Sequence, residues 1–307
     1  MTRVSRLLCV LAAGLMQVTA AVAQAPVLVL AQSEDPVHQE AVHAFSARLQ
    51  DIAPQHTVAV REGGEVERDE LDTAALVVTL GSEAATNAAR AGSTAPILHA
   101  LLSRNALEGL ERGAGSGPFT AIVLDQPAAR QVALLRMALP AHTHIATLYG
   151  TASTAHAKAL AAAASTEGLS VRTALVRSED ELYPGLQKAL QAPAVLVSLP
   201  DTTVFNRYTV QNILMTAYRL RSPVLGHSAA YVRAGAVLGL YTSATQAGHE
   251  AAGLAARLLA GDPMPPPAAP RLFEVGVNTT VARALGLQLQ PAETLTRALM
   301  QTEDGQR

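Results

Sequence analysis

The chain has 307 residues, of which 49% are hydrophobic and only 3% are aromatic, with no tryptophan. Its 23 basic and 25 acidic residues give a net charge of −2 without a basic stripe, so we expect no nucleic-acid partner. The single cysteine, Cys9, excludes a disulfide framework.

The first predicted element is an export signal. Arg3 and Arg6 precede an apolar segment over residues 7–18, and Ala21-Val22-Ala23 supplies the small residues of a cleavage site. The apolar segment is shorter than the roughly 20 residues of a membrane span. We therefore expect residues 1–23 to be a cleaved signal peptide and the mature protein to be exported. Cleavage removes Cys9, which leaves neither a thiol nucleophile nor a cysteine-ligated metal.

The first half of the mature chain alternates short apolar runs with amphipathic helical patterns, which predicts a parallel sheet covered by helices on both faces. A glycine-rich stretch over residues 109–118 and an apolar run over 119–124 then mark a lobe boundary. The expected strands are residues 27–30, 57–60, 74–80 and 96–101, and the expected helices are residues 36–49 and 84–91.

The second half repeats this pattern. Its expected strands are residues 144–149, 170–176, 194–199 and 223–226, and its expected helices are residues 154–166, 180–190 and 205–220. An extended run over 236–241, a helix over 244–260, a proline-rich stop, a run over 271–277 and a short helix from Thr279 complete the chain.

This doubling predicts an α/β fold of two Rossmann-like lobes, each a parallel sheet flanked by helices. We expect residues 24–122 and about 238–270 to form the first lobe, and residues 123–237 and about 271–307 to form the second. The late elements take the chain back between the lobes, which makes the expected hinge multi-stranded.

Enzyme motifs fail on spacing or order. Gly226-His227-Ser228-Ala229-Ala230 resembles a nucleophile elbow, but no acidic residue occurs between Ser228 and the only later histidine, His249. Residues 113–117 are rich in glycine, yet they lack the spacing of a nucleotide-binding loop. The pair His142 and His144 has no carboxylate cluster beside it. We therefore expect no enzyme, no metal and no cofactor.

The polar residues that follow the expected strands are the candidate binding groups, because strand carboxyl ends and helix N-termini converge in such folds. Ser82 and Thr86 lie where a helix N-terminus favours a carboxylate, and Asp201 offers a partner for an ammonium group. Arg104 suits an anionic ligand, and Tyr149 and Tyr231 suit a planar one. Helix capping is the competing interpretation for Ser82 and Asp201. The candidates are Ser33, Gly81, Ser82, Thr86, Ser103, Arg104, Tyr149, Thr151, Asp201, Thr203, Ser228 and Tyr231.

Four segments carry a resemblance to a known family: residues 199–204, 222–226, 232–237 and 278–287. Their order and spacing resemble the ABC-transporter solute-binding proteins that include tryptophan- and tyrosine-binding members, with the type I periplasmic-binding fold. The resemblance implies a two-lobed periplasmic receptor that closes on a small molecule and presents it to a membrane permease. It places Gly81 and Ser82 on the ligand loop of the first lobe, and Asp201 and Thr203 on that of the second.

The chain departs from that family in two places. Residues 103–105 replace the usual Asp-Pro pair after the fourth strand, and residues 118–121 replace the usual Asn-x-Thr-Gly segment. These departures touch the expected binding site and hinge, so the specificity for aromatic amino acids is not transferred. They also leave open an alternative function, a periplasmic sensory or accessory protein that contacts a membrane receptor.

Overall fold

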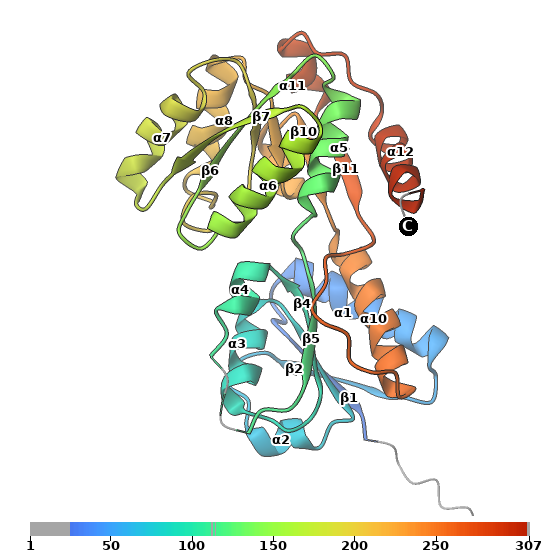
Figure 1. Ribbon diagram of the computed structural model, residues 1–307. Helices are drawn as coiled ribbons and strands as arrows, with labels where there is room; N and C mark the ends of the chain where they lie inside the picture. Colours follow the sequence, from blue (N-terminus) through green and yellow to red (C-terminus); the bar gives the residue numbers. More distant parts are fainter. Residues whose placement is uncertain (1–24, 112, 114, 306–307) are drawn as a thin grey trace, which may run out of the picture.

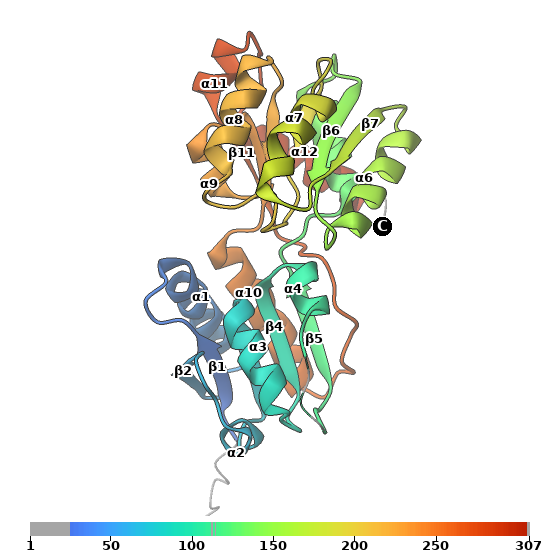
Figure 2. The same ribbon diagram turned by 90° about the vertical axis from the view of Figure 1, so that its left-hand side faces the viewer.

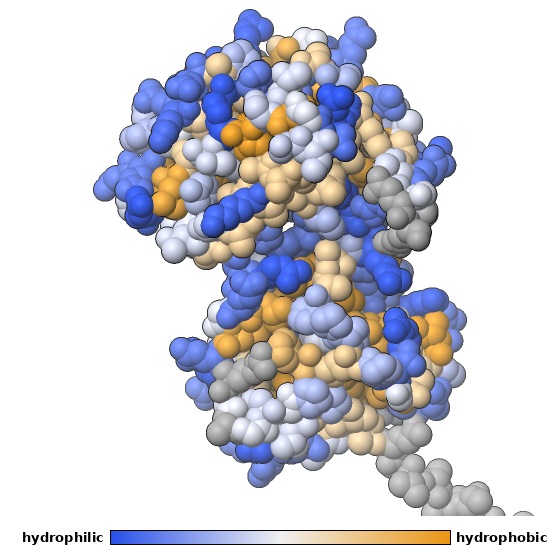
Figure 3. Space-filling view, viewed as in Figure 1, coloured by the Kyte–Doolittle hydropathy of each residue, from blue (hydrophilic) through white to orange (hydrophobic). Residues whose placement is uncertain are grey.

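The computed structural model describes residues 25–111, 113 and 115–305, and the chain forms two lobes stacked end to end (Figure 1). The predicted signal peptide, residues 1–23, lies outside the described residues. Each lobe is built around one twisted sheet with helices on both faces. Figure 3 shows the molecule narrowing to a waist between them.

The first lobe holds a parallel sheet of five strands in the order β2-β1-β3-β4-β5. Alternate residues of β1 enter different cores: Val27 and Val29 pack under α1 and α10, whereas Leu28 and Leu30 pack on the opposite face. A strand buried on both faces reads as a continuous apolar run, which explains the sequence of β1. The strands are β1 (Val27–Ala31), β2 (Val58–Glu62), β3 (Leu76–Leu80), β4 (Ile97–Leu102) and β5 (Phe119–Val123).

Two groups of helices cover this sheet. Connections between neighbouring parallel strands place α2, α3 and α4 on one face and α1 on the other, where α10 returns from the end of the chain to pack along it (Figure 2). Asp35 caps α1 by accepting a hydrogen bond from Val37 N, and Ser243 with Gln246 forms a capping box on α10. The helices are α1 (Pro36–Ile52), α2 (Arg68–Asp72), α3 (Ser82–Ala91), α4 (Arg104–Glu108) and α10 (Ala244–Leu259).

The second lobe holds a sheet of six strands in the order β11-β10-β9-β8-β6-β7, parallel except for the pair β10 and β11. Figure 2 shows α7 and α8 on the face of this sheet opposite to α6 and α12. The strands are β6 (His144–Tyr149), β7 (Ser170–Leu175), β8 (Val195–Val197), β9 (Val224–Gly226), β10 (Leu238–Tyr241) and β11 (Glu274–Val277). The helices are α5 (Ala128–Ala138), α6 (Thr154–Thr166), α7 (Leu182–Ala189), α8 (Val210–Arg219), α9 (Ala229–Ala234), α11 (Thr279–Ala284) and α12 (Ala292–Asp304).

Two details differ from the expectations. The strand at residue 238, expected in the first lobe, is β10, which pairs with β9 and β11 in the second sheet; the chain returns to the first lobe only after it. The helix expected from Phe205 begins at Val210, because Asn206 Oδ1 accepts hydrogen bonds from the N–H groups of Tyr208 and Thr209 and holds a turn there.

Three segments connect the lobes: the β5–α5 link, the β10–α10 link and the link from α10 to β11. Gln126 Nε2 donates to Thr242 Oγ1 (3.0 Å), and Thr242 Oγ1 donates to Leu272 O (2.6 Å), so one chain of hydrogen bonds joins all three. The buried Arg130 donates to Gln126 Oε1 (2.7 Å) and Pro270 O (3.0 Å). The multi-stranded hinge is therefore a hydrogen-bonded unit.

Helix α10 packs closely against α1 at Gly248. A Cβ added at Gly248 would lie 2.5 Å from Ala41 O and 2.9 Å from Phe45 N, whereas one added at Gly253 meets nothing within 4 Å. We expect Gly248→Ala to lower the free energy of unfolding by about 1–3 kcal/mol through overpacking. In the same helix, Gly253→Ala should raise it by about 0.5–1 kcal/mol. Urea denaturation measures both, and equal effects of the two substitutions would contradict the close packing.

Candidate functional site

The polar loops at the carboxyl ends of the two sheets face each other across the waist. We call residues 32–35, 81–83 and 103–105 the first jaw, and residues 149–153, 199–204 and 227–231 the second jaw. Asn105 Nδ2 donates to Pro200 O across the waist at 3.3 Å, so the jaws touch in this structure. Hydrophilic residues lie on both sides of the waist in Figure 3. Each of these six loops contains at least one of the residues predicted from the sequence to bind a ligand.

In the first jaw, the turn into α3 exposes Ser82. Gly81 has φ +100°, and a Cβ there would lie 2.6 Å from His38 Nε2, so glycine is required both by the backbone and by the imidazole packed on it. The Ser82 hydroxyl makes no hydrogen bond to other described residues. Thr86, the other predicted residue of this turn, donates its hydroxyl to Ser82 O (2.8 Å) within the helix.

An open recess of about 720 Å³ lies beside this turn, at the carboxyl ends of β1 and β2. The predicted residue Ser33 lines it with an exposed side chain, and its backbone N–H donates to the Glu62 carboxylate (3.1 Å). Gln32 Nε2 donates to the neighbouring Glu83 carboxylate. Two carboxylates therefore flank the exposed hydroxyls of the first jaw.

The β4–α4 turn connects the first jaw to the hinge. Ser103 Oγ accepts from Ala106 N (3.2 Å) and caps α4. Arg104 donates its backbone N–H to Asp125 Oδ2 at 2.7 Å. Its half-buried guanidinium makes no hydrogen bond among the described residues. Asp125 Oδ1 lies 2.9 Å from His156 Nε2 on α6. One buried carboxylate in the hinge thus contacts helices of both lobes.

In the second jaw, Asp201 is used inside the lobe. The carboxylate is 5% exposed and accepts hydrogen bonds from Gly150 N (2.8 Å), Ser153 Oγ and Thr203 N (2.9 Å). These donors occupy both oxygens, so the expected pairing of Asp201 with a ligand's ammonium group is corrected. Asp201 holds the β6–α6 loop against the β8–α8 loop and positions the second jaw.

The remaining candidates of the second jaw divide into two kinds. Ser228 caps α9 by accepting from Tyr231 N (3.4 Å), and Tyr231 and Tyr149 pack in or against the core of the lobe. Tyr231 is 7% exposed, its hydroxyl has no hydrogen-bond partner among the described residues, and burial raises its pKa above the ordinary value. Thr151 and Thr203 are exposed, and their hydroxyls make no hydrogen bond within the described part of the chain. Of the predicted residues of the second jaw, these two threonines are the ones with exposed and unpaired hydroxyls.

Three residues of this region, Asp125, His156 and His227, were absent from the predicted site. His227 Nδ1 lies 2.9 Å from Ser198 Oγ, and its ring packs 4.7 Å from the ring of Tyr231. Its position directly after β9 was the available sequence signal. Asp125 also follows a strand closely, two residues after the end of β5, but its contact with His156 joins the hinge to α6 and has no signal in the sequence.

Burial lowers the pKa of His227 to about 4, and the charge of Asp125 opposes this shift only in part. The imidazole of the second jaw is therefore neutral at neutral pH. A neutral ring offers a hydrogen-bond acceptor as well as a donor, which a charged one does not.

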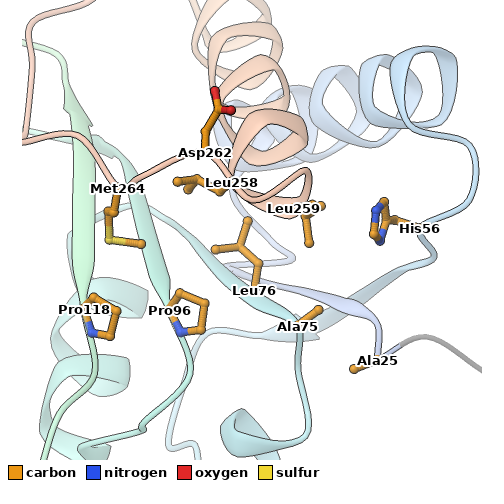
Figure 4. A pocket seen from close by; sticks show the side chains of 10 residues that line it. All are labelled: Ala25, His56, Ala75, Leu76, Pro96, Pro118, Leu258, Leu259, Asp262 and Met264. Carbon is orange, nitrogen blue, oxygen red and sulfur yellow. The ribbon is translucent and has the colours of Figure 1, made fainter.

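A cavity of about 480 Å³ lies at the opposite edge of the first sheet (Figure 4). Leu76, Leu258, Leu259, Pro96 and Met264 wall it at the amino ends of the strands and the end of α10. Ligands of open α/β sheets bind at the carboxyl ends of the strands instead. The jaws, and not this cavity, therefore form the candidate site.

Within the described residues no group of three or more His, Cys, Asp or Glu residues is placed to hold a metal ion. Nor does that part of the chain contain a helix long and apolar enough to cross a membrane.

Two mostly parallel sheets, joined by three connecting segments and with polar loops facing each other, define a two-lobed binding protein of the type I periplasmic-binding fold. The sequence profile of the ABC transporter substrate-binding proteins matches residues 70–299, and the chain belongs to that family. No curated protein sequence matches the chain. The predicted family and fold class are thereby confirmed.

Solved structures show the same fold at low sequence identity. A ligand-free, open substrate-binding protein with adhesive properties from Clostridium difficile is 18% identical with a TM-score of 0.66, covering 87% of this chain and 96% of its own. An ABC domain in complex with L-Trp from Streptococcus pneumoniae is 18% identical with a TM-score of 0.61, covering 89% and 98%. A conserved domain protein from Vibrio cholerae is 18% identical with a TM-score of 0.62, covering 89% and 98%.

The role of Asp201 is testable by stability. We expect Asp201→Ala to lower the free energy of unfolding by at least about 2 kcal/mol, because it strands the buried donors of Gly150 and Ser153. Asp180→Ala, at an exposed position, should change it by less than about 0.5 kcal/mol. Chemical denaturation compares the two variants, and a wild-type stability of Asp201→Ala would show that its hydrogen bonds contribute nothing.

His227 makes stability depend on pH. Its pKa is about 4 in the folded protein against 6.5 for the free side chain, so the unfolded chain binds the proton first as the pH falls. Stability is therefore full above pH 6.5 and declines by up to about 3 kcal/mol between pH 6.5 and 4. His227→Gln should flatten that part of the profile, while His43→Gln, at an exposed position on α1, should leave it unchanged. Denaturation series across this pH range would contradict the assignment if the His227 variant kept the wild-type slope.

Proposed function

We propose that the protein is the solute-binding component of an ABC-type uptake system, and that it closes its lobes on a small zwitterion such as an amino acid. The observation that carries this proposal is the pair of polar jaws, which face each other across the waist and both contain exposed hydroxyls without a hydrogen bond among the described residues. Family membership supports a small-molecule ligand and a permease partner. The neighbour in complex with L-Trp supports an amino acid as the ligand class.

The first jaw supplies groups for both ends of a zwitterion. Ser82 is the first residue of α3, where backbone N–H groups without an intrahelical partner and the helix dipole stabilise a carboxylate. Glu62 and Glu83 flank the adjacent recess and favour an ammonium group. Glu62 and Glu83, beside the first jaw, thus replace Asp201 of the second jaw as the proposed partners of the ligand's ammonium group.

The second jaw then completes the enclosure. Thr151 and Thr203 offer hydroxyls on loops that Asp201 holds in place, and the neutral His227 follows β9 in the third loop of this jaw. Closure over a polar ligand excludes water, which strengthens each of these interactions. The ligand shifts the open-to-closed equilibrium only by the difference in its affinity for the two states, so contacts with both jaws are what drive closure.

Export completes the proposal. The predicted signal peptide of residues 1–23 would deliver the mature chain to the periplasm, where a solute-binding protein meets both its ligand and its permease. A direct test is titration calorimetry of the chain lacking residues 1–23 against the common amino acids, with small-angle scattering of the best binder. Binding accompanied by a fall in the radius of gyration is expected, and the absence of any binder among small zwitterions would refute the ligand class.

Ser82→Ala separates a ligand contact from a structural one. The hydroxyl makes no hydrogen bond within the described residues, so thermal stability should stay at the wild-type value. Loss of one hydrogen bond of about 1 kcal/mol should weaken ligand binding about fivefold. Ser165→Ala, on the exposed side of α6 and outside both jaws, is the matched control and should bind as the wild type does. A Ser82 variant that binds as tightly as this control would remove Ser82 from the site.

A further inference from the structure

The outer face of α8 exposes large side chains that a soluble lobe has no need to expose. Tyr208 is 68% exposed, Met215 48%, Tyr218 46% and Leu220 42%. In a chain with only 3% aromatic residues, two tyrosines on one short helical segment are a marked concentration. Met215 and Tyr218, three residues apart, lie on one side of α8, and Tyr208 lies in the turn that leads into the start of the helix; we call these three residues the stripe.

The charged residues on α8 and at its two ends are all positive. Arg207, Arg219 and Arg221 are all exposed on α8 and its two ends. No aspartate or glutamate occurs anywhere between Asp201 and Glu250, although the whole chain carries a net charge of −2. We call Arg207, Tyr208, Met215, Tyr218, Arg219, Leu220 and Arg221 the α8 face.

Two of the arginines are held against the stripe. The guanidinium of Arg207 lies 4.6 Å from the centre of the Tyr208 ring, and Arg219 Nη2 lies 3.5 Å from Met215 Sδ. Among the ion pairs of the described residues, none involves Arg207, Arg219 or Arg221. Their charge is therefore available to a partner, and their side chains are partly ordered before it arrives.

The α8 face is also placed to report on the site. The β8–α8 loop that Asp201 anchors in the second jaw leads directly into the start of α8, so the Arg207 and Tyr208 end of this face follows the jaw in the chain. Figure 2 shows α8 beside α7 and away from α6 and α12. A partner that covers the whole face would therefore reach the β8–α8 loop of the second jaw.

We propose that the α8 face is a docking surface for an acidic segment of a partner protein, its Asp or Glu carboxylates pairing with the three arginines around a tyrosine and methionine centre. Tyr, Met and Arg are the residues enriched at protein interfaces, and the planar guanidinium matches a carboxylate in two hydrogen bonds. Surfaces that recognise anionic lipids use clusters of 4–8 basic residues, more than the three present here. The proposal rests on the proposed function only in that the partner is the membrane component of the same system.

Site-directed photo-crosslinking in intact cells tests this surface. A benzoylphenylalanine placed at Tyr218, in the full chain produced in its own host, should crosslink to a peptide that contains Asp or Glu. Arg219→Glu should lower the yield of that product at least fivefold, and Asp or Glu→Arg in the crosslinked partner segment should restore it. Arg136→Glu, an equal change of charge at an exposed position of α5, should leave the yield unchanged.

Each other outcome overturns the proposal. Crosslinks to lipid alone would make the face a membrane contact, and crosslinks to a second copy of this chain would make it a self-association surface. A yield that is insensitive to Arg219→Glu, or not restored by reversal in the partner, would remove the charge pairing. Ligand titration of the same variants keeps the two proposals apart, because Arg219→Glu should bind the jaw ligand with wild-type affinity even when docking is lost.

Discussion

A buried guanidinium stands at the centre of the hinge. Arg130 is 4% exposed, and its charge is stabilised by the Glu303 carboxylate of α12 (Nη2 to Oε2, 2.8 Å) and by the Phe273 ring 4.1 Å away. A buried charge needs hydrogen-bond partners, and Arg130 also donates from Nη1 to Gln126 Oε1 and Pro270 O. Those two residues belong to two of the three segments that join the lobes. The geometry of both jaws therefore depends on one arginine that touches neither.

The jaws differ in how their polar groups are used. In the second jaw the carboxylate of Asp201 is bonded within the lobe, where it holds two loops together. The groups of this jaw that we propose for a ligand are neutral. In the first jaw the hydroxyl of Ser82 is free and carboxylates flank the adjoining recess. The two lobes thus share an architecture but differ in the groups at their strand ends. The first jaw mainly presents charged groups, and the second mainly presents a rigid, uncharged surface.

Much of this architecture is readable from the sequence because burial dictates it. Strands enclosed on both faces, such as β1 and β3, must be continuous apolar runs, and polar residues at strand ends must meet at one edge of a sheet. The sequence could not reveal how those polar residues pair. Whether Asp201 meets a ligand or Gly150, and whether Asp125 meets His156, depends on distances between loops far apart in the chain. The sheet to which β10 belongs, and the delayed start of α8 at Val210, depend equally on tertiary contacts and on a local turn.

The placement of α10 has a consequence for the order in which the protein is made. The five strands of the first sheet end at Val123, but α10, which covers one face of that sheet beside α1, begins about 120 residues later. At a synthesis rate of 5–20 residues per second this is a delay of roughly ten seconds. During that interval the face formed by β3 and β4 lacks part of its cover, while the whole central part of the second lobe emerges. The first lobe, although its synthesis begins first, is completed only after most of the second lobe. Until then, a chaperone that shields exposed apolar surface would bind the uncovered face of β3 and β4.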